Sequence, residues 1–570
     1  MTMATERVTG RSLSVVAIAL ITFAITTATA LAVPGFLTQK ADLAGCVSDD
    51  GTGGECRDGE ALDEPVAIAA SPDGKNVYVA SEDSEAIAIF DRAGDGTLTQ
   101  KVGVAGCISD DGSGGACQDG YGLERADAVV VSPDGENVYV AAHFEDVILT
   151  FNRDTATGEL TQAGCIADEL GDLGFCVQSD RGLRGPQGLA VSPDGQNVYV
   201  ASETDNAVGV LDRDADGALS QKAGTAGCVA DGGLGGDCQN GRTLITASEV
   251  VVSPDGANIY VASANPEPGG VAILDRGPGG ALTQKAGTAG CISDDGSGSE
   301  DPGVCQDGRA ILGVIDLAVS SDGKSVYTAS PFSSAIAILD RGTGGALTQK
   351  AGTAGCISES GTAGACQDGF AVAAAEGVAV SPDGASVYAT APGFGFQAIS
   401  VFDRDGSGAL TQKTGTAKCV SEFGTADGVP GACQDGKGLD GVSDVIVSPD
   451  GTSVYSTSLS SDAIAIFERG EGAATDTTPP ETQITKGPKQ KSKSKKATFE
   501  FTGTDDVTAP AALSFECSLD GEPVASCSSP ATFDKLKKGK HEFEVQARDQ
   551  AGNTDASPAS YDWKVKKKKK

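Results

Sequence analysis

The chain has 570 residues and a formal net charge of −37 at pH 7. Residues 473–570 carry a net charge of +3, so the remaining residues carry −40. A surface this acidic repels nucleic acid and anionic membranes, and it attracts cations or basic partners. We therefore expect no nucleic acid among its partners, although part of the acidity can simply keep an exported protein soluble.

The N-terminal segment has the pattern of a secretory signal peptide. Arg7 and Arg11 precede an apolar run that ends at Leu31, and Ala30-Leu-Ala32 is a small-x-small cleavage site. The alternative is an uncleaved anchor helix. No later apolar stretch is long enough to span a bilayer. We predict that residues 1–32 are removed, that no transmembrane anchor remains, and that the protein is secreted or associated with the cell envelope.

One stretch recurs along the chain and organises it. The tetrad Ser-Pro-Asp-Gly lies between two β-branched or aromatic runs, as in Gly188–Val191 and Asn197–Ala201, and it recurs every 60 to 67 residues. Two such runs joined by Pro-Asp-Gly predict a hairpin, because Pro sets φ and Gly accepts φ > 0. The copies, one of them with Ser in place of Pro, begin at Ser71, Ser132, Ser192, Ser253, Ser320, Ser381 and Ser448.

Each repeat holds two further strand-like runs, an Asp-Arg run such as Ala86–Arg92 and a Leu-Thr-Gln run such as Leu282–Gln284. Four short strands per repeat, with turns between them, predict one blade of a β-propeller. A first Leu-Thr-Gln occurs at Leu37–Gln39, ahead of any tetrad, and none follows Arg469. We therefore predict an all-β fold, a seven-bladed propeller over residues 33–470 whose N-terminal strand completes the last blade and removes a free sheet edge.

The 16 cysteines form eight close pairs, one in each repeat and one near the C-terminus. An even number in a chain with a signal peptide predicts a disulfide framework. A structural zinc site needs four ligands, and each repeat offers only two cysteines. The expected bridges are Cys46–Cys56, Cys107–Cys117, Cys165–Cys176, Cys228–Cys238, Cys291–Cys305, Cys356–Cys366, Cys419–Cys433 and Cys517–Cys527.

The repeats are longer than a minimal four-stranded propeller blade, and the additional residues lie between the fourth strand of one blade and the first strand of the next. Cys107–Gly120 is a representative insert, rich in Gly and Asp. We expect the seven inserts to form an acidic crown around one mouth of the central channel, a placement often used for binding. The alternative for any single acid is a solvated turn residue that accepts Asx-type hydrogen bonds. The candidate binding-face residues are Asp110, Asp111, Asp119, Asp294, Asp295, Asp307, Asp368 and Asp435.

One turn has the spacing of a calcium loop. Asp212, Asp214 and Asp216 follow the pattern D-x-D-x-D-G, which brings three carboxylates to one hard cation. Ser220 and Ala223 stand where later ligands would come, and the Asp-Arg pair recurs in turns that cannot form a calcium loop. The recurrence favours a structural role, with calcium as the alternative and as the one cofactor considered.

The catalytic inventory is small. The sequence has two histidines, His143 after the second strand of the second repeat and His541 near the C-terminus. It has no G-x-S-x-G, H-E-x-x-H or G-x-x-x-x-G-K-[ST] motif. We expect His143 to be an exposed loop residue, with Glu82 and Glu203 at the matching places of neighbouring repeats. The tyrosine of each second strand is expected to be a packing residue.

The combination of S-P-D-G-x-x-V-Y-V-A, A-I-A-I-F-D-R and G-x-L-T-Q resembles the seven-bladed propellers of the lactonase and YVTN-repeat superfamily, over roughly residues 36–470. The resemblance implies the propeller fold. Lactonase-type members include enzymes that open sugar lactones such as 6-phosphogluconolactone, with His, Arg and acidic residues gathered at one mouth of the channel. YVTN-type members are often exported binding or surface proteins. No catalytic residue is carried over by position.

The sequence predicts that the C-terminal region is a separate module. Residues 471–484 have the composition of a linker, and residues 485–565 show alternating runs with turns, which predict a small β-sandwich. Its F-E-C-S-L-D-G and A-R-D-x-A-G-N segments resemble bacterial Ig-like domains, and Cys517 and Cys527 are expected to staple a local hairpin. Residues 566–570 form a poly-Lys tail that either contacts an anionic cell-wall polymer or is solvated.

Two functions follow from these patterns. The first is a non-enzymatic binding or scaffolding protein at the cell envelope, a monomer whose ligand is cationic or a cell-wall polymer. The alternative is a secreted lactonase-like hydrolase that uses carboxylates and arginines near the channel mouth. Near-identical blades favour binding, whereas blade asymmetry and a convergent pocket favour the hydrolase.

Overall fold

The computed structural model describes residues 35–168, 174, 176–179, 181–267, 269–298, 302–393, 395–470, 480–504, 513–522, 525–548, 554–555 and 557–567. The predicted signal peptide lies outside the described residues, as does the predicted linker up to residue 479. None of the helices in these ranges has the length and apolar character needed to span a bilayer.

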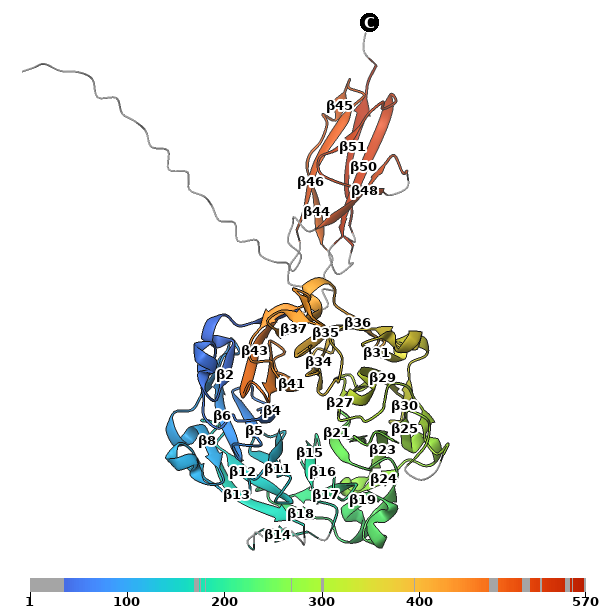
Figure 1. Ribbon diagram of the computed structural model, residues 1–570. Helices are drawn as coiled ribbons and strands as arrows, with labels where there is room; N and C mark the ends of the chain where they lie inside the picture. Colours follow the sequence, from blue (N-terminus) through green and yellow to red (C-terminus); the bar gives the residue numbers. More distant parts are fainter. Residues whose placement is uncertain are drawn as a thin grey trace, which may run out of the picture. The chain divides into compact units, whose positions relative to one another are not determined.

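Seven sheets, one for each repeat, lie in a ring (Figure 1). We number the blades 1 to 7 in the order of their tetrads. The first strands are β4 (Pro65–Ala70), β10 (Ala126–Val131), β15 (Pro186–Val191), β21 (Ala247–Val252), β27 (Asp316–Val319), β33 (Val378–Val380) and β41 (Val442–Val447). Each first strand contacts the first strands of both neighbouring blades, so these strands surround the ring axis.

The second and third strands of each blade pair antiparallel outward from the first strand. The second strands are β5 (Asn76–Ser81), β11 (Asn137–Ala142), β16 (Asn197–Ser202), β22 (Asn258–Ser263), β28 (Ser325–Ser330), β34 (Ser386–Ala391) and β42 (Ser453–Ser458). The third strands are β6 (Ala86–Arg92), β12 (Val147–Arg153), β17 (Ala207–Arg213), β23 (Gly270–Arg276), β29 (Ala335–Arg341), β35 (Ala398–Arg404) and β43 (Ala463–Arg469).

The tetrad makes the predicted hairpin between the first and second strands. In blade 1, Gly74 has a φ of 67°, which suits a residue without a Cβ. The hydroxyl of Ser71 donates to Asp73 Oδ1 at 2.6 Å and accepts the N–H of Asn76 at 3.0 Å. The tetrad therefore fixes the turn with its own side chains.

The fourth strand differs from expectation because six of the seven blades divide it into two pieces that both pair with the third strand. The pieces are β1 (Leu37–Gln39) and β2 (Cys46–Ser48), β7 (Leu98–Gln100) and β8 (Cys107–Ser109), β18 (Leu219–Gln221) and β19 (Cys228–Asp231), β24 (Leu282–Gln284) and β25 (Cys291–Ser293), β30 (Leu347–Gln349) and β31 (Cys356–Ser358), and β36 (Leu410–Gln412) and β37 (Cys419–Glu422). Blade 2 has one continuous strand, β13 (Leu160–Ala167).

The predicted inserts add a fifth strand that pairs parallel with the outer piece of the fourth strand. These strands are β3 (Arg57–Asp58), β9 (Gln118–Asp119), β14 (Val177–Gln178), β20 (Gln239–Gly241), β26 (Gln306–Asp307), β32 (Gln367–Asp368) and β40 (Gln434–Gly436). The inserts therefore thicken the outer edge of each blade. The expected crown around the channel mouth is wrong in this respect.

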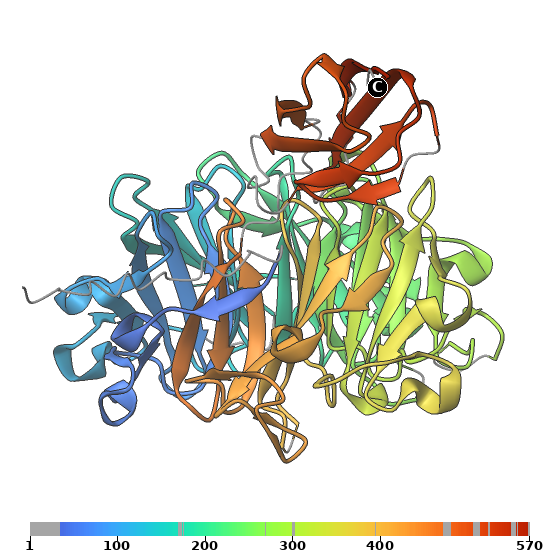
Figure 2. The ribbon, with the colours of Figure 1, turned by 90° about the horizontal axis from the view of Figure 1, so that it is seen from above.

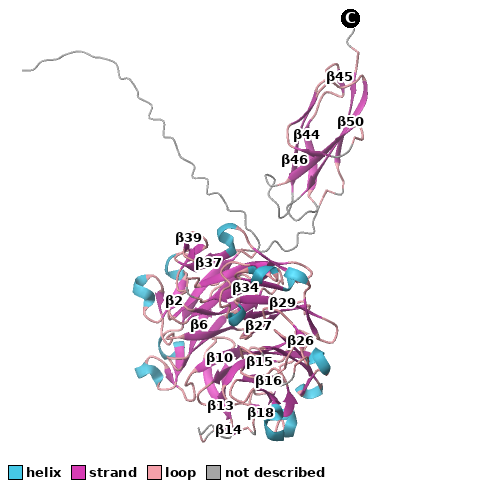
Figure 3. Cartoon of the chain, turned by 45° about the vertical axis from the view of Figure 1, so that its right-hand side comes forward, coloured by secondary structure: helices cyan, strands magenta, loops and turns pink. Residues whose placement is uncertain are grey.

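Short 3-10 turns connect these outer strands and appear as cyan coils at the outer edge of the ring in Figure 3. They are η1 (Asp42–Ala44), η2 (Gly51–Gly54), η3 (Gly103–Gly106), η4 (Gly112–Gly115), η5 (Gly224–Gly227), η6 (Gly232–Gly236), η8 (Gly287–Gly290), η10 (Gly352–Gly355), η11 (Gly361–Gly364) and η12 (Gly415–Lys418). Two further turns are η7 (Pro278–Gly280) and η9 (Pro331–Ser333), and blade 6 adds a hairpin of β38 (Thr425–Ala426) and β39 (Val429–Pro430).

The N-terminal strand closes the ring as predicted. β1 pairs antiparallel with β43, with Leu37 opposite Arg469, and β2 pairs with the same strand, with Cys46 opposite Ala465. In Figure 2 this blue segment lies beside the orange strands of blade 7. Leu37 is fully buried in the core shared by blades 6 and 7. Seven blades and the shared last sheet are therefore confirmed.

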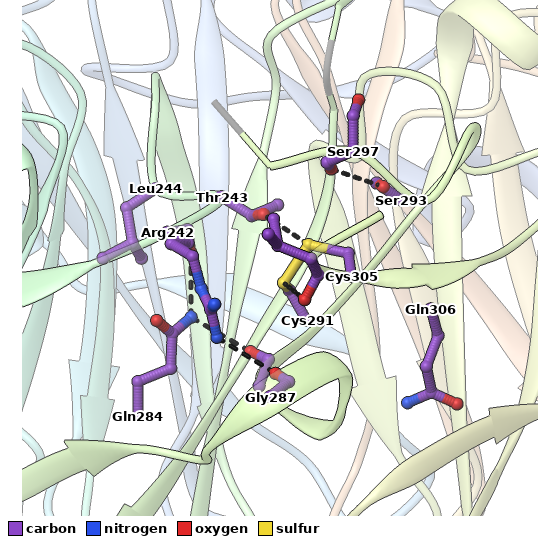
Figure 4. Close-up of a disulfide and its surroundings, with 12 residues drawn as sticks. Arg242, Thr243, Leu244, Gln284, Gly287, Cys291, Ser293, Ser297, Cys305 and Gln306 are labelled. Atoms are coloured by element: carbon purple, nitrogen blue, oxygen red, sulfur yellow. Dashed lines mark hydrogen bonds between the residues drawn. A yellow bond between two sulfur atoms is a disulfide. The ribbon is translucent and has the colours of Figure 1, made fainter. Parts of the chain in front are cut away.

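All eight predicted cysteine pairs are disulfide-bonded. Figure 4 shows the Cys291–Cys305 bridge of blade 4 against the segment that arrives from blade 3. The Oγ1 of Thr243 lies 3.3 Å from Cys305 Sγ, and Gln284 Nε2 donates to the carbonyl of Arg242 at 2.9 Å. The disulfide of blade 4 therefore supports the connection that arrives from blade 3.

The C-terminal module has two sheets. One contains β44 (Glu481–Lys486), β46 (Ala497–Thr504) and β49 (Ala531–Phe533), and the other β45 (Lys491–Ser492), β51 (Ala559–Val565), β50 (Gly539–Arg548), β47 (Ser514–Leu519) and β48 (Ala525–Cys527). Phe499 and Phe543, from different sheets, stack at 4.1 Å in a common core. β44 begins inside the predicted linker, and Cys517–Cys527 staples the β47–β48 hairpin as expected. The Ig-like classification stays a prediction.

Candidate active site at one mouth of the propeller

A cavity of about 600 Å³ lies where the first strands of the blades begin. Blades 1 to 3 contribute Glu82, Arg125, Asp127 and Glu203 to its lining, and blades 4 to 7 contribute four more carboxylic acids. Those four are Glu249, Asp316, Glu376 and Asp444. The strand pattern explains this placement, because the second strand ends and the first strand begins on the same face of the ring.

Arg125 is the cation of the cavity lining, and it lies between two carboxylates. Its Nε is 3.1 Å from Glu82 Oε2 and 3.4 Å from Asp127 Oδ1. Its guanidinium also lies 5.0 Å from the ring centre of the exposed Phe144. Arg125 has a φ of 55°, in the left-handed region. Glycine occupies this backbone position in blades 3, 5 and 7, at Gly185, Gly313 and Gly441. The fold therefore does not require a side chain here, and blade 2 carries a guanidinium at a strained backbone position.

His143 lies between Asp127 of its own blade and Glu203 of blade 3. Its Nδ1 is 3.5 Å from Asp127 Oδ2, and its Nε2 is 3.7 Å from Glu203 Oε2. The His143 side chain is only 12% exposed, so the expectation of an exposed loop residue is wrong. Gln187 Nε2 donates to Glu203 at 3.3 Å and extends the polar group into blade 3.

The protonation states of these groups are unusual. Burial and the negative charge of Glu82 raise the pKa of Asp127 to about 8. Burial also raises the pKa of Glu82. Burial and the charge of Arg125 lower the pKa of His143. At neutral pH Asp127 is therefore mostly protonated, and His143 is neutral.

Three buried polar atoms of this group, Arg125 Nε, Asp127 Oδ1 and His143 Nδ1, lie 3.1–3.5 Å from a polar atom of a neighbouring side chain, but these contacts lack the geometry of a hydrogen bond. Buried polar atoms are almost always satisfied in a folded protein, and leaving one unpaired costs about 1–3 kcal/mol. Ion-pair contacts, rather than well-formed hydrogen bonds, therefore hold this cluster together.

The blades differ at this mouth. At the position eleven residues after the tetrad serine, blades 1, 2 and 3 carry Glu82, His143 and Glu203. Blades 4 to 7 carry small or apolar residues there, namely Ala264, Pro331, Pro392 and Leu459. The blades are thus nearly identical in their strand sequences, but they differ in the residues that line the channel mouth.

The predicted calcium residues do not converge. Asp212 pairs with Lys222 and accepts a hydrogen bond from Asn197 Nδ2 at 2.9 Å. Asp214 accepts the N–H groups of Asp216 and Ala218 at 3.0 and 2.9 Å, and Asp216 is exposed. Within the described ranges, no group of three acidic, His or Cys side chains has the arrangement of a metal site. These aspartates support a turn.

The predicted binding-face acids lie at the outer edges of the blades, away from the first strands. Asp110 and Asp294 accept the N–H groups of Leu123 and Ile311, at 3.1 and 3.3 Å, where the chain turns towards the next blade. Asp111 and Asp295 accept backbone N–H groups two residues on, at 2.7 and 2.8 Å. Asp119, Asp307, Asp368 and Asp435 are exposed residues of the fifth strands.

The fold and the polar mouth define a seven-bladed β-propeller with a candidate active site on its axis. The sequence model of one family, "Lactonase, 7-bladed beta-propeller", matches residues 63–170 and 177–284. Over these residues, which belong to blades 1 to 4, the chain is similar to lactonase-type propellers. The matched residues include Glu82, Arg125, Asp127, His143 and Glu203.

Solved structures similar to the chain include hydrazine synthase of Kuenenia stuttgartiensis, with 16% identity, a TM-score of 0.43, and coverage of 73% of this chain and 98% of that one. A protein of Bacteroides fragilis described as a 6-phosphogluconolactonase has 18% identity, a TM-score of 0.40, and coverage of 61% and 82%. The periplasmic gluconolactonase of Pseudomonas aeruginosa has 16% identity, a TM-score of 0.39, and coverage of 67% and 88%. No curated protein matches the chain.

Proposed function

We propose that the propeller is a hydrolase that opens a cyclic ester, a lactone, at the mouth formed by blades 1 to 3. The observation that carries this proposal is the contact of Arg125 with both Glu82 and Asp127 at the mouth of the propeller. The matched lactonase family supports the same chemistry. The binding or scaffolding role predicted from near-identical blades loses its main support, because the mouth is asymmetric.

The cluster offers an acid, a base and a cation. In the proposed reaction, the ionised Glu82 takes a proton from water, and the water oxygen forms a bond to the acyl carbon of the lactone. Arg125 stabilises the negative charge that develops on the carbonyl oxygen. The acyl C–O bond of the ring then breaks, and protonated Asp127 gives its proton to the departing ring oxygen.

The product is an open hydroxy acid, so one water is consumed and atoms balance. Proton transfer from Glu82 to Asp127 restores the starting state. His143 and Glu203 are positioning residues in this scheme. His143 is neutral beside Asp127, and Glu203 Oε2 lies 3.7 Å from its Nε2. At neutral pH the product acid loses its proton to water, and the resulting carboxylate faces a cavity lined by carboxylic acids, which favours its release.

A panel of lactones tests the proposal. We expect the purified protein to accelerate ring opening of at least one lactone, and Asp127→Asn and Glu82→Gln each to lower kcat by about 10²–10⁴ fold. Asp119→Asn, which removes an exposed acid at the outer edge of blade 1, is the matched control and should keep full activity. Absence of turnover across the panel, or equal activity of Asp127→Asn, would contradict the proposal.

We also propose export through the predicted signal peptide, residues 1–32. Eight disulfides support an oxidising destination, extracellular or periplasmic. In this proposal the C-terminal module is an Ig-like spacer at the cell envelope. N-terminal sequencing of the exported protein should find residue 33 first, and an N-terminus at residue 1 would contradict it.

A further inference from the structure

Lysines gather at one end of the C-terminal module. β44, which follows the linker, begins at Glu481 opposite Thr504, whereas β46 begins at the other end of the same sheet with Ala497. Three segments that are separate in sequence meet at this other end, namely residues 491–496, 535–540 and 564–567. They contain four, four and three lysines, and all of these lysines are exposed. We call these three segments the lysine end.

Backbone hydrogen bonds hold the three segments together. The N–H of Leu536 donates to the carbonyl of Lys495 at 2.9 Å, and the N–H of Lys566 donates to the carbonyl of Ser492 at 2.8 Å. The Leu536 side chain is buried in the core of the module. The lysines of these segments are therefore carried on a fixed backbone, and their positions relative to one another are set by the fold.

Three of the lysines form a row across the sheet. Lys491 of β45 lies opposite Lys564 of β51, and Lys564 lies opposite Lys540 of β50. Figure 1 shows these three strands at the module. Neighbouring strands are about 4.8 Å apart, and residues directly opposite each other point to the same face. Like charges in this arrangement destabilise a sheet, so an anion placed along the row relieves a repulsion that the fold itself creates.

No carboxylate of the described part of the module is ion-paired with the lysine end. The ion pairs there are Lys486 with Glu500 and His541 with Asp520. The next pair on the face of the row is Glu542 opposite Asp562, which marks its acidic border.

The charge of the whole chain isolates this patch. Residues 473–570 carry +3, whereas the remaining residues carry −40. A polyanion is therefore repelled by most of the molecule and attracted to the lysine end.

The composition of the patch indicates the kind of anion. Its three segments contain lysine but no arginine. Arginine suits bidentate recognition of a single phosphate, whereas lysine is a compact point charge. A series of such charges suits a series of phosphates. None of the large apolar side chains that the described residues expose belongs to this module, so it offers no apolar anchor for a bilayer.

We propose that the lysine end binds a linear polymer of phosphodiesters in the cell envelope, with the polymer lying across the row of Lys491, Lys564 and Lys540. Release of the counterions of the polymer drives the binding. The choice of an envelope polymer rests on the proposed export. The binding itself is independent of export and of lactone hydrolysis.

Titration of the purified protein with water-soluble poly(glycerol phosphate), at a series of salt concentrations, tests the proposal. We expect the triple variant Lys491→Gln, Lys540→Gln and Lys564→Gln to bind about tenfold or more weakly. The slope of log Kd against log salt concentration should fall by about 2, because each contacted phosphate of a single strand contributes about 0.7. Absence of binding by the wild type at low salt, or an unchanged affinity of the triple variant, would overturn the proposal.

A matched control separates the patch from the net charge. Lys75→Gln, Lys324→Gln and Lys437→Gln remove the same charge from exposed lysines of the propeller. This variant should keep the affinity and the salt slope of the wild type, with thermal unfolding showing that both triple variants are folded. Equal weakening in the two variants would show that net charge alone governs binding, and would overturn the assignment to the lysine end.

Two further measurements test the choice of partner. Phosphatidylglycerol vesicles and duplex DNA present phosphates on other macromolecules, and tighter binding of either one at the same salt concentration would overturn the polymer as partner. Sedimentation at low salt should show no self-association. Self-association that the Lys491, Lys540 and Lys564 variant abolishes would instead assign the lysine end to the acidic propeller of a second copy. A failure of export would remove the envelope as the source of the polymer and leave the measured binding in place.

Discussion

Arg469 donates from Nε to the hydroxyl of Tyr388 at 2.9 Å, and that hydroxyl donates to the carbonyl of Gly35 at 3.0 Å. Arg469 also donates from Nη2 to Asp383 and from Nη1 to the carbonyl of Gly451. Blade 6, blade 7 and the N-terminal segment are thus joined by one guanidinium and one phenol. The contact fastens the ring where the two ends of the propeller meet.

The same clasp recurs between all neighbouring blades. Each Arg of the third strand donates from Nε to the Tyr of the preceding blade, and each Tyr hydroxyl donates to a turn carbonyl of the following blade, or of Gly35 in the last case. The other Arg–Tyr pairs are Arg92–Tyr455, Arg153–Tyr78, Arg213–Tyr139, Arg276–Tyr199, Arg341–Tyr260 and Arg404–Tyr327. A structural role for the Asp-Arg run and a packing role for the tyrosines are confirmed.

Replacing Arg469 with Lys should destabilise the propeller. A lysine cannot donate to Tyr388, Asp383 and Gly451 together, so we expect the free energy of unfolding to fall by roughly 2 kcal/mol. The loss is smaller than for a fully buried pair because Asp383 is 43% exposed. Arg181→Lys is the control, since its pair with Asp237 is exposed on both sides. Equal effects in urea unfolding would contradict the role of the clasp.

Removal of one staple should destabilise the ring without changing the cavity. Cys356 and Cys366 close a loop with a sequence separation of 10 and pack against Ala310. We expect the double replacement by Ser to lower the free energy of unfolding by about 2–3 kcal/mol, as loop closure in the unfolded chain predicts. The rate of lactone opening should be unchanged, because the staple lies at the outer edge of blade 5. A loss of that activity in the folded variant would show that the staple also shapes the mouth.

Stability should depend on pH in two opposite ways. Hydrogen bonds from Ser71 and Arg153 outweigh burial and lower the pKa of Asp73 to about 2. A carboxyl group with a lowered pKa stabilises the fold above its unfolded pKa, and this contribution is lost as pH falls from about 4 to 2. Glu376, whose pKa burial raises to about 7, has the opposite sign. The native state then holds more protons than the unfolded state, so stability falls as pH rises from about 5 to 7.

The measurement is urea unfolding between pH 2 and pH 8, with a maximum expected near pH 4 to 5. Glu376→Gln should flatten the decline above pH 5 and be the more stable protein at pH 8, by up to roughly 3 kcal/mol. Below pH 4 the variant and the wild type should lose stability together, because Asp73, whose protonation causes this loss, is the same in both. A wild-type curve that rises steadily from pH 4 to 8 would contradict the raised pKa of the channel acid.

The repeat itself could be predicted because its chemistry is local. Ser71, Asp73 and Gly74 form the turn through their own side chains and backbone. The N-terminal Leu-Thr-Gln run at Leu37 can pair only with blade 7, because that is the one repeat without such a run of its own. The cysteine pairs are close in sequence, so their bridges require no knowledge of the ring. The position of the inserts could not be predicted in the same way. Gln118 and Asp119 form a parallel fifth strand, and parallel pairing leaves no turn signal in the sequence.

The residues of the candidate site were missed for a similar reason. Glu82, Arg125 and His143 come from different connections, and each is an ordinary polar residue within its own repeat. The available signal was a comparison of the repeats at a fixed distance from the tetrad. At that position blades 1 to 3 carry ionisable residues, whereas blades 4 and 5 carry Ala264 and Pro331. The burial of His143 depends on Asp127 and Glu203 of two blades, which no single repeat contains.

The rate of lactone opening should follow a bell-shaped dependence on pH. The ascending limb reflects loss of the proton from Glu82, whose pKa burial raises, and the descending limb reflects loss of the second proton of the pair, near pH 8. Asp119→Asn should keep both limbs. Glu82→Gln should abolish most turnover, and a carbon-13 NMR titration of Asp127 in that variant should show a lower pKa, because the neighbouring negative charge is gone. A kcat/KM that climbs without a maximum to pH 10 would exclude a carboxylic acid as the proton donor.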